Sequence, residues 1–409
     1  MFPSSHLAHR RLIRLPLVLA LAACQAESDA VEPGPLDAPD AGPACPSGSP
    51  PAPISGVFAF PQAVVFAGAH LVVGSVDLDE NYASRSGFLT VLDPSTGAVL
   101  NRIVTSQPNP QRLVVHGDRL FVVNTGRTEY SPDTGVTAKS RGSIDVIPLD
   151  ALASAPRPHR SDEIAASADG TSGAPIDLVF VGERAYISSG LSNQIFIYNA
   201  ANGTLERGIE DGPRFGSAEP ALALGAVAAA GTLVYVADYN SDAIHLFDTT
   251  TETFSPCAVS VDDDPMMLAG PSSPLVEGDD LYVVLQGFQK VVKISRADLE
   301  LVAAAPADAC PSVAVTDVIS PTGGIPNDLD ALDDQLFVVH SMDNTVVAYE
   351  NDGDLWTKSH QFDLPLGANP WHAAFSADGR YLAVTEWKNH AVSIFDRTCD
   401  DAVVRLTVQ

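Results

Sequence analysis

The stretch NPWHAAFSADGRYLAVTEWKNHAVSIFD, at residues 369–396, decides the fold of this chain. Its proline is followed by a β-rich run that opens at Tyr381 (YLAVT) and by a second alternating run that opens at Ala391 (AVSIF). Asp378 and Gly379, shortly before the first run, are residue types that tolerate a tight turn. The stretch therefore predicts a strand after the proline, a turn, a second strand, a hairpin and a third strand.

This arrangement of a proline and an apolar run occurs seven times. The prolines are Pro61, Pro110, Pro175, Pro220, Pro271, Pro326 and Pro370. The runs open at Leu71, Leu120, Ala185, Val234, Leu281, Leu336 and Tyr381, which is ten residues after the proline in five units, eleven in the seventh and fourteen in the fourth. In the last five units a further alternating strand opens ten residues later, at Ile195, Ile244, Val291, Val346 and Ala391. The recurrence predicts a repeat architecture.

A single repeat of this kind cannot bury both of its apolar faces. Units with a period of roughly 40 to 50 residues must therefore stack on one another, and a ring leaves no open end. No alternation of strands with helices is visible, which argues against an α/β fold. We expect an all-β fold, a seven-bladed β-propeller of four-stranded antiparallel blades, forming one domain over residues 55–409.

The N-terminus carries a targeting signal. Arg10, Arg11 and Arg14 precede an apolar stretch that is too short to span a bilayer and that ends in the sequence LAAC at residues 21–24. This ending resembles the lipobox of bacterial lipoproteins, although an ordinary secretory signal with an incidental cysteine is the alternative. The resemblance implies a signal peptide at residues 1–23, a lipidated Cys24 and attachment to the membrane through the lipid anchor only.

The residues that follow Cys24 define the expected location of the protein. Residues 24–54 are rich in Pro, Ala, Gly, Ser and acidic residues, which is typical of a disordered tether. Gln25 stands where an aspartate would in many bacteria indicate retention at the inner membrane. We therefore expect a protein of the bacterial cell envelope, anchored at the outer membrane on its periplasmic or its surface side.

The formal net charge of −28 excludes several kinds of partner. A polyanion such as DNA or RNA, or an anionic bilayer surface, would be repelled by this charge. Basic ligands and divalent cations are permitted by it, although many acidic residues also simply keep a secreted surface soluble. We expect a monomer that binds no nucleic acid.

Four cysteines remain after Cys24, and an even number in an exported chain indicates two disulfides with three possible pairings. Cys257 and Cys310 fall near the outer strands of units four and five, which would be neighbours in a ring. Cys45 lies just before the first unit and Cys399 lies in the last, so a bond between them would close the ring. A metal site is the competing interpretation, but no CxxC or HxxH spacing supports it.

The unit at residues 369–396 resembles the repeat of the YVTN family of β-propellers, with its proline, short strand, S-x-D-G turn and Tyr-Val-Thr-Asn-like strand. The other six units match this pattern more loosely. The resemblance implies that each unit forms one blade of a propeller. It implies no single function, because the family includes binding proteins, surface proteins and lactonase-like enzymes.

Residues near the start of the innermost strands are expected to line one mouth of the central channel. They include Asn109, Asp177, Glu219, Asn327, Asp328, Asn369 and His372. In a metal-dependent lactonase or lyase, Asp177, Glu219, Asn327 and Asp328 would be the candidate metal ligands and His372 the candidate general acid or base. A polar channel lined by water is the alternative, and the chain shows no multi-histidine, haem, nucleophile-elbow or Walker motif.

Calcium is the cofactor that the acidic clusters permit. Residues 77–81 (DLDEN) open like a calcium loop, but Tyr82 and Phe88 occupy the positions where an EF-hand needs glycine and glutamate. The acidic residues at 262–264 and at 327–334 can be read equally well as solvated turns. We expect no cofactor, with Ca²⁺ as the open possibility.

Three long segments favour a working surface on one face of the ring. Residues 76–87, 125–142 and 151–172 are expected to be long loops that share the face of the channel mouth. We predict that Arg127, Glu129, Tyr130 and Arg141 bind a ligand together with Asn109, Asp177, Glu219 and Asn369. The expected function is a lipid-anchored binding or scaffold module for an envelope protein or a small-molecule ligand. The alternative is the metal-dependent enzyme, with its site at the channel mouth.

Overall fold

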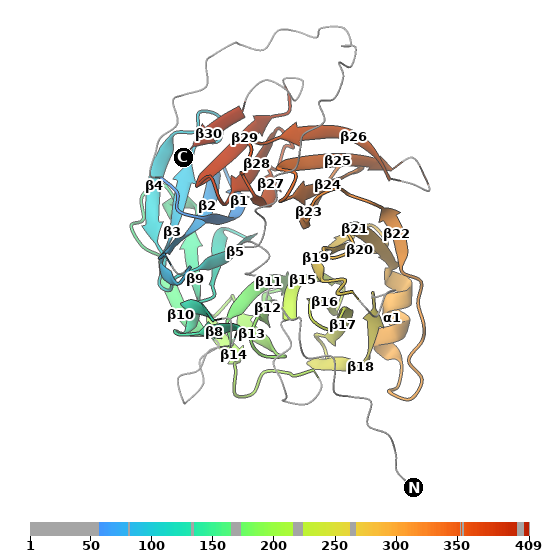
Figure 1. The fold of residues 1–409 in the computed structure, drawn as a ribbon. Coiled ribbons are helices and arrows are strands. Elements are labelled where there is room, and N and C mark those ends of the chain that lie inside the picture. Colours follow the sequence, from blue (N-terminus) through green and yellow to red (C-terminus); the bar gives the residue numbers. More distant parts are fainter. Residues whose placement is uncertain are drawn as a thin grey trace.

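The computed structural model describes residues 57–80, 82–131, 135–164, 173–215, 224–261, 267–351, 353, 356–398 and 405–408. Within them, seven four-stranded antiparallel sheets form a ring, as Figure 1 shows. The prediction of a seven-bladed β-propeller is therefore confirmed. No helix in the described ranges is long and apolar enough to cross a membrane. The signal segment, Cys24 and the tether lie outside these ranges.

Each blade is built from strands that are consecutive in the sequence, except that a small hairpin interrupts blade 2. Blade 1 contains β1 (Pro61–Ala67), β2 (His70–Leu78), β3 (Ser84–Leu92) and β4 (Val99–Val104). Blade 2 contains β5 (Pro110–His116), β6 (Arg119–Asn124), β9 (Gly142–Pro148) and β10 (Arg160–Ile164), with the inserted hairpin β7 (Thr128–Ser131) and β8 (Gly135–Ala138) and the short 3-10 helix η1 (Leu149–Ala151). Blade 3 contains β11 (Pro175–Val181), β12 (Arg184–Ser189), β13 (Ile195–Asn199) and β14 (Thr204–Arg207).

The remaining blades repeat this order. Blade 4 contains β15 (Leu224–Ala230), β16 (Leu233–Asp238), β17 (Ala243–Asp248) and β18 (Thr253–Ser260). Blade 5 contains β19 (Pro271–Glu277), β20 (Asp280–Leu285), β21 (Lys290–Ser295), the helix α1 (Arg296–Ala304) and β22 (Thr316–Ile319). Blade 6 contains β23 (Pro326–Leu332), β24 (Gln335–His340), β25 (Thr345–Asn351) and β26 (Trp356–Asp363). Blade 7 contains β27 (Pro370–Phe375), β28 (Tyr381–Glu386), β29 (Ala391–Asp396) and β30 (Arg405–Val408).

The repeated prolines begin the innermost strands. Six of the seven stand at the first position of such a strand, where proline costs no ladder hydrogen bond, and Pro220 lies outside the described residues. In five blades the residue before the proline is left-handed, as in Asn109 (φ 68°) and Asn369 (φ 47°). The carbonyl of Asn109 accepts a hydrogen bond from the Thr125 N–H at 2.9 Å, and the carbonyl of Ala174 accepts one from the Gly190 N–H at 2.7 Å. These bonds tie the start of an innermost strand to the end of the second strand.

A β-bulge follows near the start of every innermost strand, where the register with the second strand shifts. A bulge bends the strand and redirects the neighbouring side chains. We call the face of the ring at which the innermost strands begin the proline face. The hairpins between second and third strands open on the same face, because the strands of each blade alternate in direction.

The core lies between blades. The buried apolar side chains form seven clusters among the described residues, one at each interface between neighbouring blades. At the junction of blades 7 and 1, Phe58, Val64 and Leu71 pack with Val392 and Ile394. Burying one such side chain contributes about 1.5 to 3 kcal/mol, and each interface buries several of them. The described part of blade 7 takes all four strands from the C-terminal end, so packing of β1 against β27 closes the ring.

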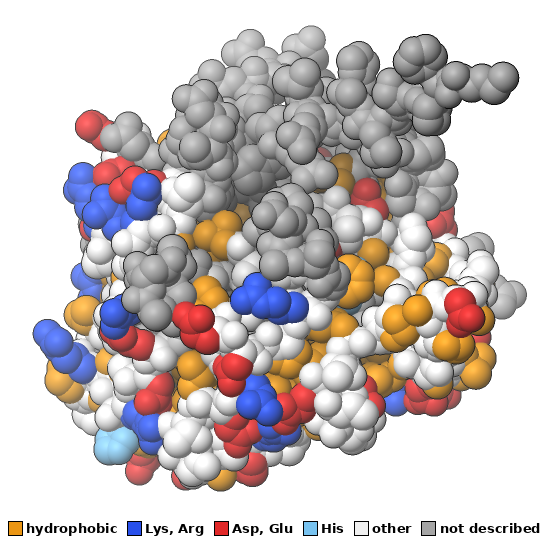
Figure 2. Space-filling view, turned by 90° about the horizontal axis from the view of Figure 1, so that it is seen from below, with side chains coloured by type: hydrophobic (Ala, Val, Ile, Leu, Met, Phe, Trp, Pro, Cys, Tyr) orange, Lys and Arg blue, Asp and Glu red, His pale blue; other side chains and the backbone are white. Residues whose placement is uncertain are grey.

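Exposed ion pairs also connect neighbouring blades. Arg184 of blade 3 lies 2.7 Å from Glu206 (Nη2 to Oε2) and also pairs with Glu252 of blade 4. Arg207 Nε lies 3.1 Å from the other oxygen of Glu252, Oε2. Figure 2 shows the general pattern: Lys and Arg side chains are interspersed with Asp and Glu on the face displayed.

Two of the three long segments differ from the expected loops. Residues 76–87 mostly continue β2 and β3, which remain paired as far as Leu78 and Ser84. Residues 151–172 contain β10, the outer strand of blade 2, and residues 165–172 lie outside the described part. Only residues 125–142 form an insertion, which contains the hairpin β7–β8. The strand pattern of the sequence could not separate an extended hairpin from a loop.

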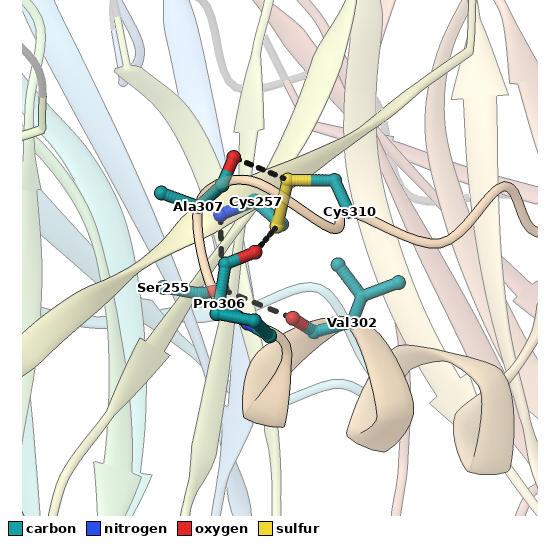
Figure 3. The surroundings of a disulfide bond; sticks show 6 residues. All are labelled: Ser255, Cys257, Val302, Pro306, Ala307 and Cys310. Atoms are coloured by element: carbon teal, nitrogen blue, oxygen red, sulfur yellow. Dashed lines mark hydrogen bonds between the residues drawn. A yellow bond between two sulfur atoms is a disulfide. The ribbon is translucent and has the colours of Figure 1, made fainter.

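Helix α1 was not expected from the sequence. It buries Leu299 and Val302 in the apolar cluster between blades 4 and 5. Figure 3 shows its last turn beside the disulfide between Cys257 and Cys310, whose Cα atoms are 5.4 Å apart; here Ser255 donates a hydrogen bond of 3.1 Å to the Val302 carbonyl. The predicted pairing of these two cysteines is confirmed. Cys45 and Cys399 lie outside the described residues, so their bond stays a prediction.

Candidate functional site

The inserted hairpin and the channel mouth share the proline face, as expected. The Ser140 hydroxyl donates to Oε1 of Gln107 at 3.3 Å, which ties the end of residues 125–142 to the link before β5. On the other side of this link, the Thr105 N–H donates to the Gly87 carbonyl at 3.1 Å. The hairpin ends of blades 1 and 2 therefore border the start of β5, where Asn109 lies.

Side-chain amides line the mouth. Oδ1 of Asn109 accepts hydrogen bonds from Gln62 Nε2 at 2.8 Å and from Gln111 Nε2 at 3.0 Å. Gln111 also donates to Gln62 Oε1 at 2.7 Å, which links blades 1 and 2. In blade 6, Asn327 donates to the Pro370 carbonyl of blade 7 at 3.2 Å. Such groups offer hydrogen-bond donors and acceptors to a ligand.

A second layer of polar residues occupies the second position after the proline in five blades. It consists of Arg112, Asp177, Ser273, Asp328 and His372, and we call it the belt. Arg112 Nε lies 3.0 Å from Asp177 Oδ1, between blades 2 and 3. Asp177 Oδ2 also accepts a hydrogen bond of 3.0 Å from the Val227 N–H of blade 4. The belt therefore joins neighbouring blades through charged contacts.

Asp328 and His372 form an ordered pair in the other half of the belt. His372 Nδ1 lies 3.0 Å from Asp328 Oδ2, which also accepts the Ala373 N–H at 3.1 Å. Asp328 Oδ1 accepts a hydrogen bond of 3.2 Å from the Ser273 hydroxyl of blade 5. No partner for Nε2 of His372 is found among the described residues, so this nitrogen is available to a ligand.

Charge interactions tune these groups. The Asp177 carboxylate raises the pKa of Arg112 against the opposing effect of burial, and Asp328 and Asp330 add to this rise. Burial disfavours the ionised form of Asp328, but His372 and Arg112 hold its pKa below the usual range. Asp330, two residues further along β23, has its pKa raised to about 7 by burial and by the charge of Asp328. The belt thus holds fixed charges of both signs beside one group that titrates near neutrality.

The described carboxylates of the channel and of the DLDEN stretch are engaged by other groups. No group of three or more His, Cys, Asp or Glu side chains in the described ranges could hold a metal. Asp177 is engaged by Arg112 and a backbone N–H, and both oxygens of Asp328 accept hydrogen bonds. Glu219 and the acidic residues at 262–264 lie outside the described residues. Asp79, in the DLDEN stretch, accepts the Ala83 N–H at 2.9 Å and so stabilises a turn.

The predicted loop residues carry charges that their neighbours neutralise. Arg127 Nη2 lies 2.9 Å from Glu129 Oε1, and Lys139 Nζ lies 3.6 Å from Glu129 Oε2. Arg141 Nη1 lies 2.5 Å from Glu163 Oε2. The side chain of Tyr130 lies outside the described part of the structure. These residues are found on the proline face, but none of the described contacts joins their side chains to the belt.

Sequence reasoning found part of the belt and missed the rest. Asp177, Asp328 and His372 were predicted at the channel, and two of them form a direct pair. Arg112 was missed although it stands at the same distance from its proline, so the register of the repeat was a signal that could have found it. Asn369 lies at the mouth as expected, and its Oδ1 is buried without a hydrogen-bond partner among the described residues.

Comparison with known proteins supports the class of fold that these observations define. No family model matches the sequence, and no curated protein matches it. Many solved structures match in shape. The periplasmic gluconolactonase PpgL of Pseudomonas aeruginosa has a TM-score of 0.58 at 16% identity, covering 83% of this chain and 95% of that chain.

Two further solved structures match over a similar length. A streptogramin B lyase has a TM-score of 0.57 at 12% identity, covering 82% of this chain and 93% of that chain. A chain of the mitotic checkpoint complex has a TM-score of 0.53 at 13% identity, covering 88% of this chain and 96% of that chain. At these identities the likeness shows the propeller fold alone.

Proposed function

We propose that this chain is a lipid-anchored propeller of the bacterial cell envelope that binds a small, neutral, polyhydroxylated ligand at the mouth of its channel. The observation that carries this proposal is the belt, in which Arg112 and His372 stand against Asp177 and Asp328. Because groups of both signs face the channel, a ligand with a strong net charge would be repelled by part of the belt, so a neutral ligand is favoured. The hydroxyls of a sugar or polyol both donate and accept, so they can use the carboxylates, the guanidinium and the amides together.

The channel is a better candidate than the inserted hairpin. The three basic side chains of the hairpin are each paired with a carboxylate at the surface, namely Arg127, Lys139 and Arg141. Their charges are therefore largely neutralised and attract a partner protein only weakly. The terminal nitrogens of Arg112 have no hydrogen-bond partner among the described residues, and its side chain is 39% exposed. A ligand in the channel would therefore find an unused planar donor.

Calorimetry with glucono-1,5-lactone and with myo-inositol tests the binding site. We expect binding to the mature protein and a loss of at least about tenfold, roughly 1.4 kcal/mol, in the Arg112→Lys variant, because lysine cannot reproduce the planar fork. Arg127→Lys on the inserted hairpin is the matched control and should bind as the wild type does. Equal affinity of Arg112→Lys and wild type for both probes would reject the belt as the binding site.

The anchor rests on the LAAC sequence that ends the signal segment. Radiolabelled palmitate should enter the wild-type protein, and Cys24→Ala should lose the label because no other cysteine has a signal core before it. Cys45→Ala is the control and should keep the label. Equal labelling of wild type and Cys24→Ala would reject the lipoprotein assignment.

A hydrolase is the second candidate, and the pair of Asp328 and His372 is the observation that favours it. Asp328 orients the imidazole through Nδ1, so Nε2 can take a proton from water. The water oxygen would then bond to the carbonyl carbon of a lactone, Arg112 would stabilise the oxyanion, and the ring C–O bond would break as the proton passes to the leaving oxygen. The product is an open-chain hydroxy acid.

A pH-stat experiment with glucono-1,5-lactone decides between binding and hydrolysis. An enzyme should release acid faster than the spontaneous reaction, and His372→Gln should lower this rate by about 10² or more, since general-base catalysis contributes that much. Lys388→Gln, in the hairpin between β28 and β29, is the control. A rate equal to the spontaneous one at saturating protein would leave binding as the function.

A further inference from the structure

Aromatic side chains gather on the proline face where blade 1 meets blade 7. Trp371 directly follows Pro370, at the position that Gln62, Gln111 and Asn327 occupy in other blades. Its ring centroid lies 6.4 Å from that of Trp387, in the hairpin between β28 and β29. Two of the three tryptophans of the chain therefore lie together beside the polar mouth.

Tyr82 extends this group outward. It stands at the tip of the hairpin between β2 and β3, and its ring lies nearly parallel to that of Trp387, with an interplanar angle of 13° and a centroid distance of 6.5 Å. Tyr82 is 54% exposed, whereas Trp387 is 8% exposed and also contacts Phe60 at 4.8 Å between centroids. Trp387 and Phe60 thus belong to the packing that closes the ring, while Tyr82 is not needed for it.

The backbone holds Tyr82 in an unusual conformation. Its φ of 58° is left-handed, which is costly for a bulky side chain and persists only where the surroundings impose it. Asp79 supplies this constraint, because its carboxylate accepts the Ala83 N–H at 2.9 Å and its carbonyl accepts the Tyr82 N–H at 3.0 Å. The strained turn presents an exposed aromatic ring beside Trp387.

We propose that Trp371 and Tyr82, whose rings both pack against Trp387, form an aromatic platform for the second and later sugar rings of an oligosaccharide whose first ring lies in the channel mouth. This inference rests on the proposed binding of a polyhydroxylated ligand. The C–H face of a pyranose is apolar and packs on an aromatic ring, while its hydroxyls stay at the edge and need polar partners. Trp387 is 8% exposed, so it supports the rings of Trp371 and Tyr82 from below and is not itself a contact for a sugar.

The platform predicts a specific dependence of affinity on chain length. On an array of linear oligosaccharides with one to six sugar rings, at least one trisaccharide should bind about tenfold tighter than its own monosaccharide. Tyr82→Ala should remove this gain and leave the monosaccharide affinity unchanged, because Tyr82 lies away from the belt. Tyr82→Phe should keep the gain, since stacking does not need the hydroxyl.

Two controls make the outcome decisive. Met342→Ala removes another exposed apolar side chain from the corresponding hairpin of blade 6 and should change no affinity. Thermal unfolding of Tyr82→Ala should match the wild type, which separates a loss of binding from a loss of folding. An array without any bound member, or a gain with chain length that survives Tyr82→Ala, would overturn the platform. If a trisaccharide binds through Tyr82 while Arg112→Lys has no effect, the platform stands and the belt assignment fails.

Discussion

Asp238 is the last residue of the apolar run that opens at Val234, and it stabilises the turn that follows. It is fully buried at the end of β16, and its Oδ1 accepts the Asn240 and Ser241 N–H groups at 3.1 and 3.3 Å. Its Oδ2 accepts the Ser241 hydroxyl at 2.6 Å and lies 3.2 Å from His245 Nε2. Ser189 and Glu386 end other second strands and also bind their hairpins. In these three blades, the polar residue at the end of the second strand thus clamps the turn that follows.

Replacing this clamp should destabilise the fold. Asp238→Ala leaves two turn N–H groups and the buried His245 without their partner, so we expect the free energy of unfolding to fall by about 3 kcal/mol. Urea denaturation measures this loss. Asp248→Ala, which removes a more exposed acceptor of the Thr250 N–H, is the control and should cost about 1 kcal/mol. Equal losses in both variants would show that burial of the clamp does not matter.

Asp330 should make stability depend on pH. Its folded pKa of about 7 lies above the unfolded value near 4, so the folded state holds one more proton between these pH values. The stability that protonated Asp330 contributes is therefore fully present below pH about 4 and is lost as the pH rises through about 7.

The Asp330→Asn variant tests this dependence. The difference in unfolding free energy between Asp330→Asn and wild type should grow from pH about 4 to about 7 and stay constant above. Urea denaturation at several pH values measures it, with Asp334→Asn in the following exposed turn as the control. A constant difference across this range would contradict the raised pKa.

At the scale of elements, the disulfide beside α1 should contribute measurably to stability. The loop between Cys257 and Cys310 spans 53 residues, so the chain-entropy model gives about 4 kcal/mol. The double variant Cys257→Ala with Cys310→Ala should lose this amount in guanidinium denaturation. The single variant Met342→Ala, in an exposed hairpin of blade 6, is the comparison and should match the wild type. A double variant as stable as the wild type would show that contacts between blades 4 and 5 suffice.

The sequence allows the blades to be predicted because its signals are local. Six of the prolines begin the innermost strands, and the start of each second strand lies within one residue of the predicted run. Helix α1 gives a weaker signal, since only Leu299 and Val302 are buried among its nine residues. A helix of only nine residues between two strands of one blade is easily missed in a strand pattern.

The candidate site could be predicted only in part, because its pairs join distant repeats. Asp328 and His372 are 44 residues apart and meet through the bulges of β23 and β27. The register of the repeat could have identified Arg112, but it does not encode which side chain of another blade Arg112 would contact. The aromatic platform needs the hairpin of blade 1 to reach blade 7 across the closure of the ring, which no local pattern encodes.

For the whole molecule, the formal net charge of −28 should dominate the response to salt. Exposed ion pairs such as Arg207 with Glu252 stabilise little in water, so screening them costs little. Raising NaCl from about 0.01 M to about 1 M shortens the Debye length from about 30 Å to about 3 Å and relieves self-repulsion. We therefore expect Tm to rise with salt in calorimetry.

The isoelectric point supplies the control for this prediction. Near pH 4.4 the net charge vanishes, and with it the gain from screening. Tm should there be independent of salt or fall slightly as ion pairs weaken. A Tm that falls with salt at neutral pH would mean that ion pairs between blades outweigh the net charge.

The belt has a consequence for how such a protein can change over generations. Arg112, Asp177, Ser273, Asp328 and His372 belong to none of the seven apolar clusters between blades. A codon change at one of these five positions therefore alters the chemistry of the channel, while the apolar packing between blades is inherited unchanged. A lineage can thus explore many combinations of ligand contacts on a scaffold that already folds, with paired positions such as Asp328 and His372 changing together.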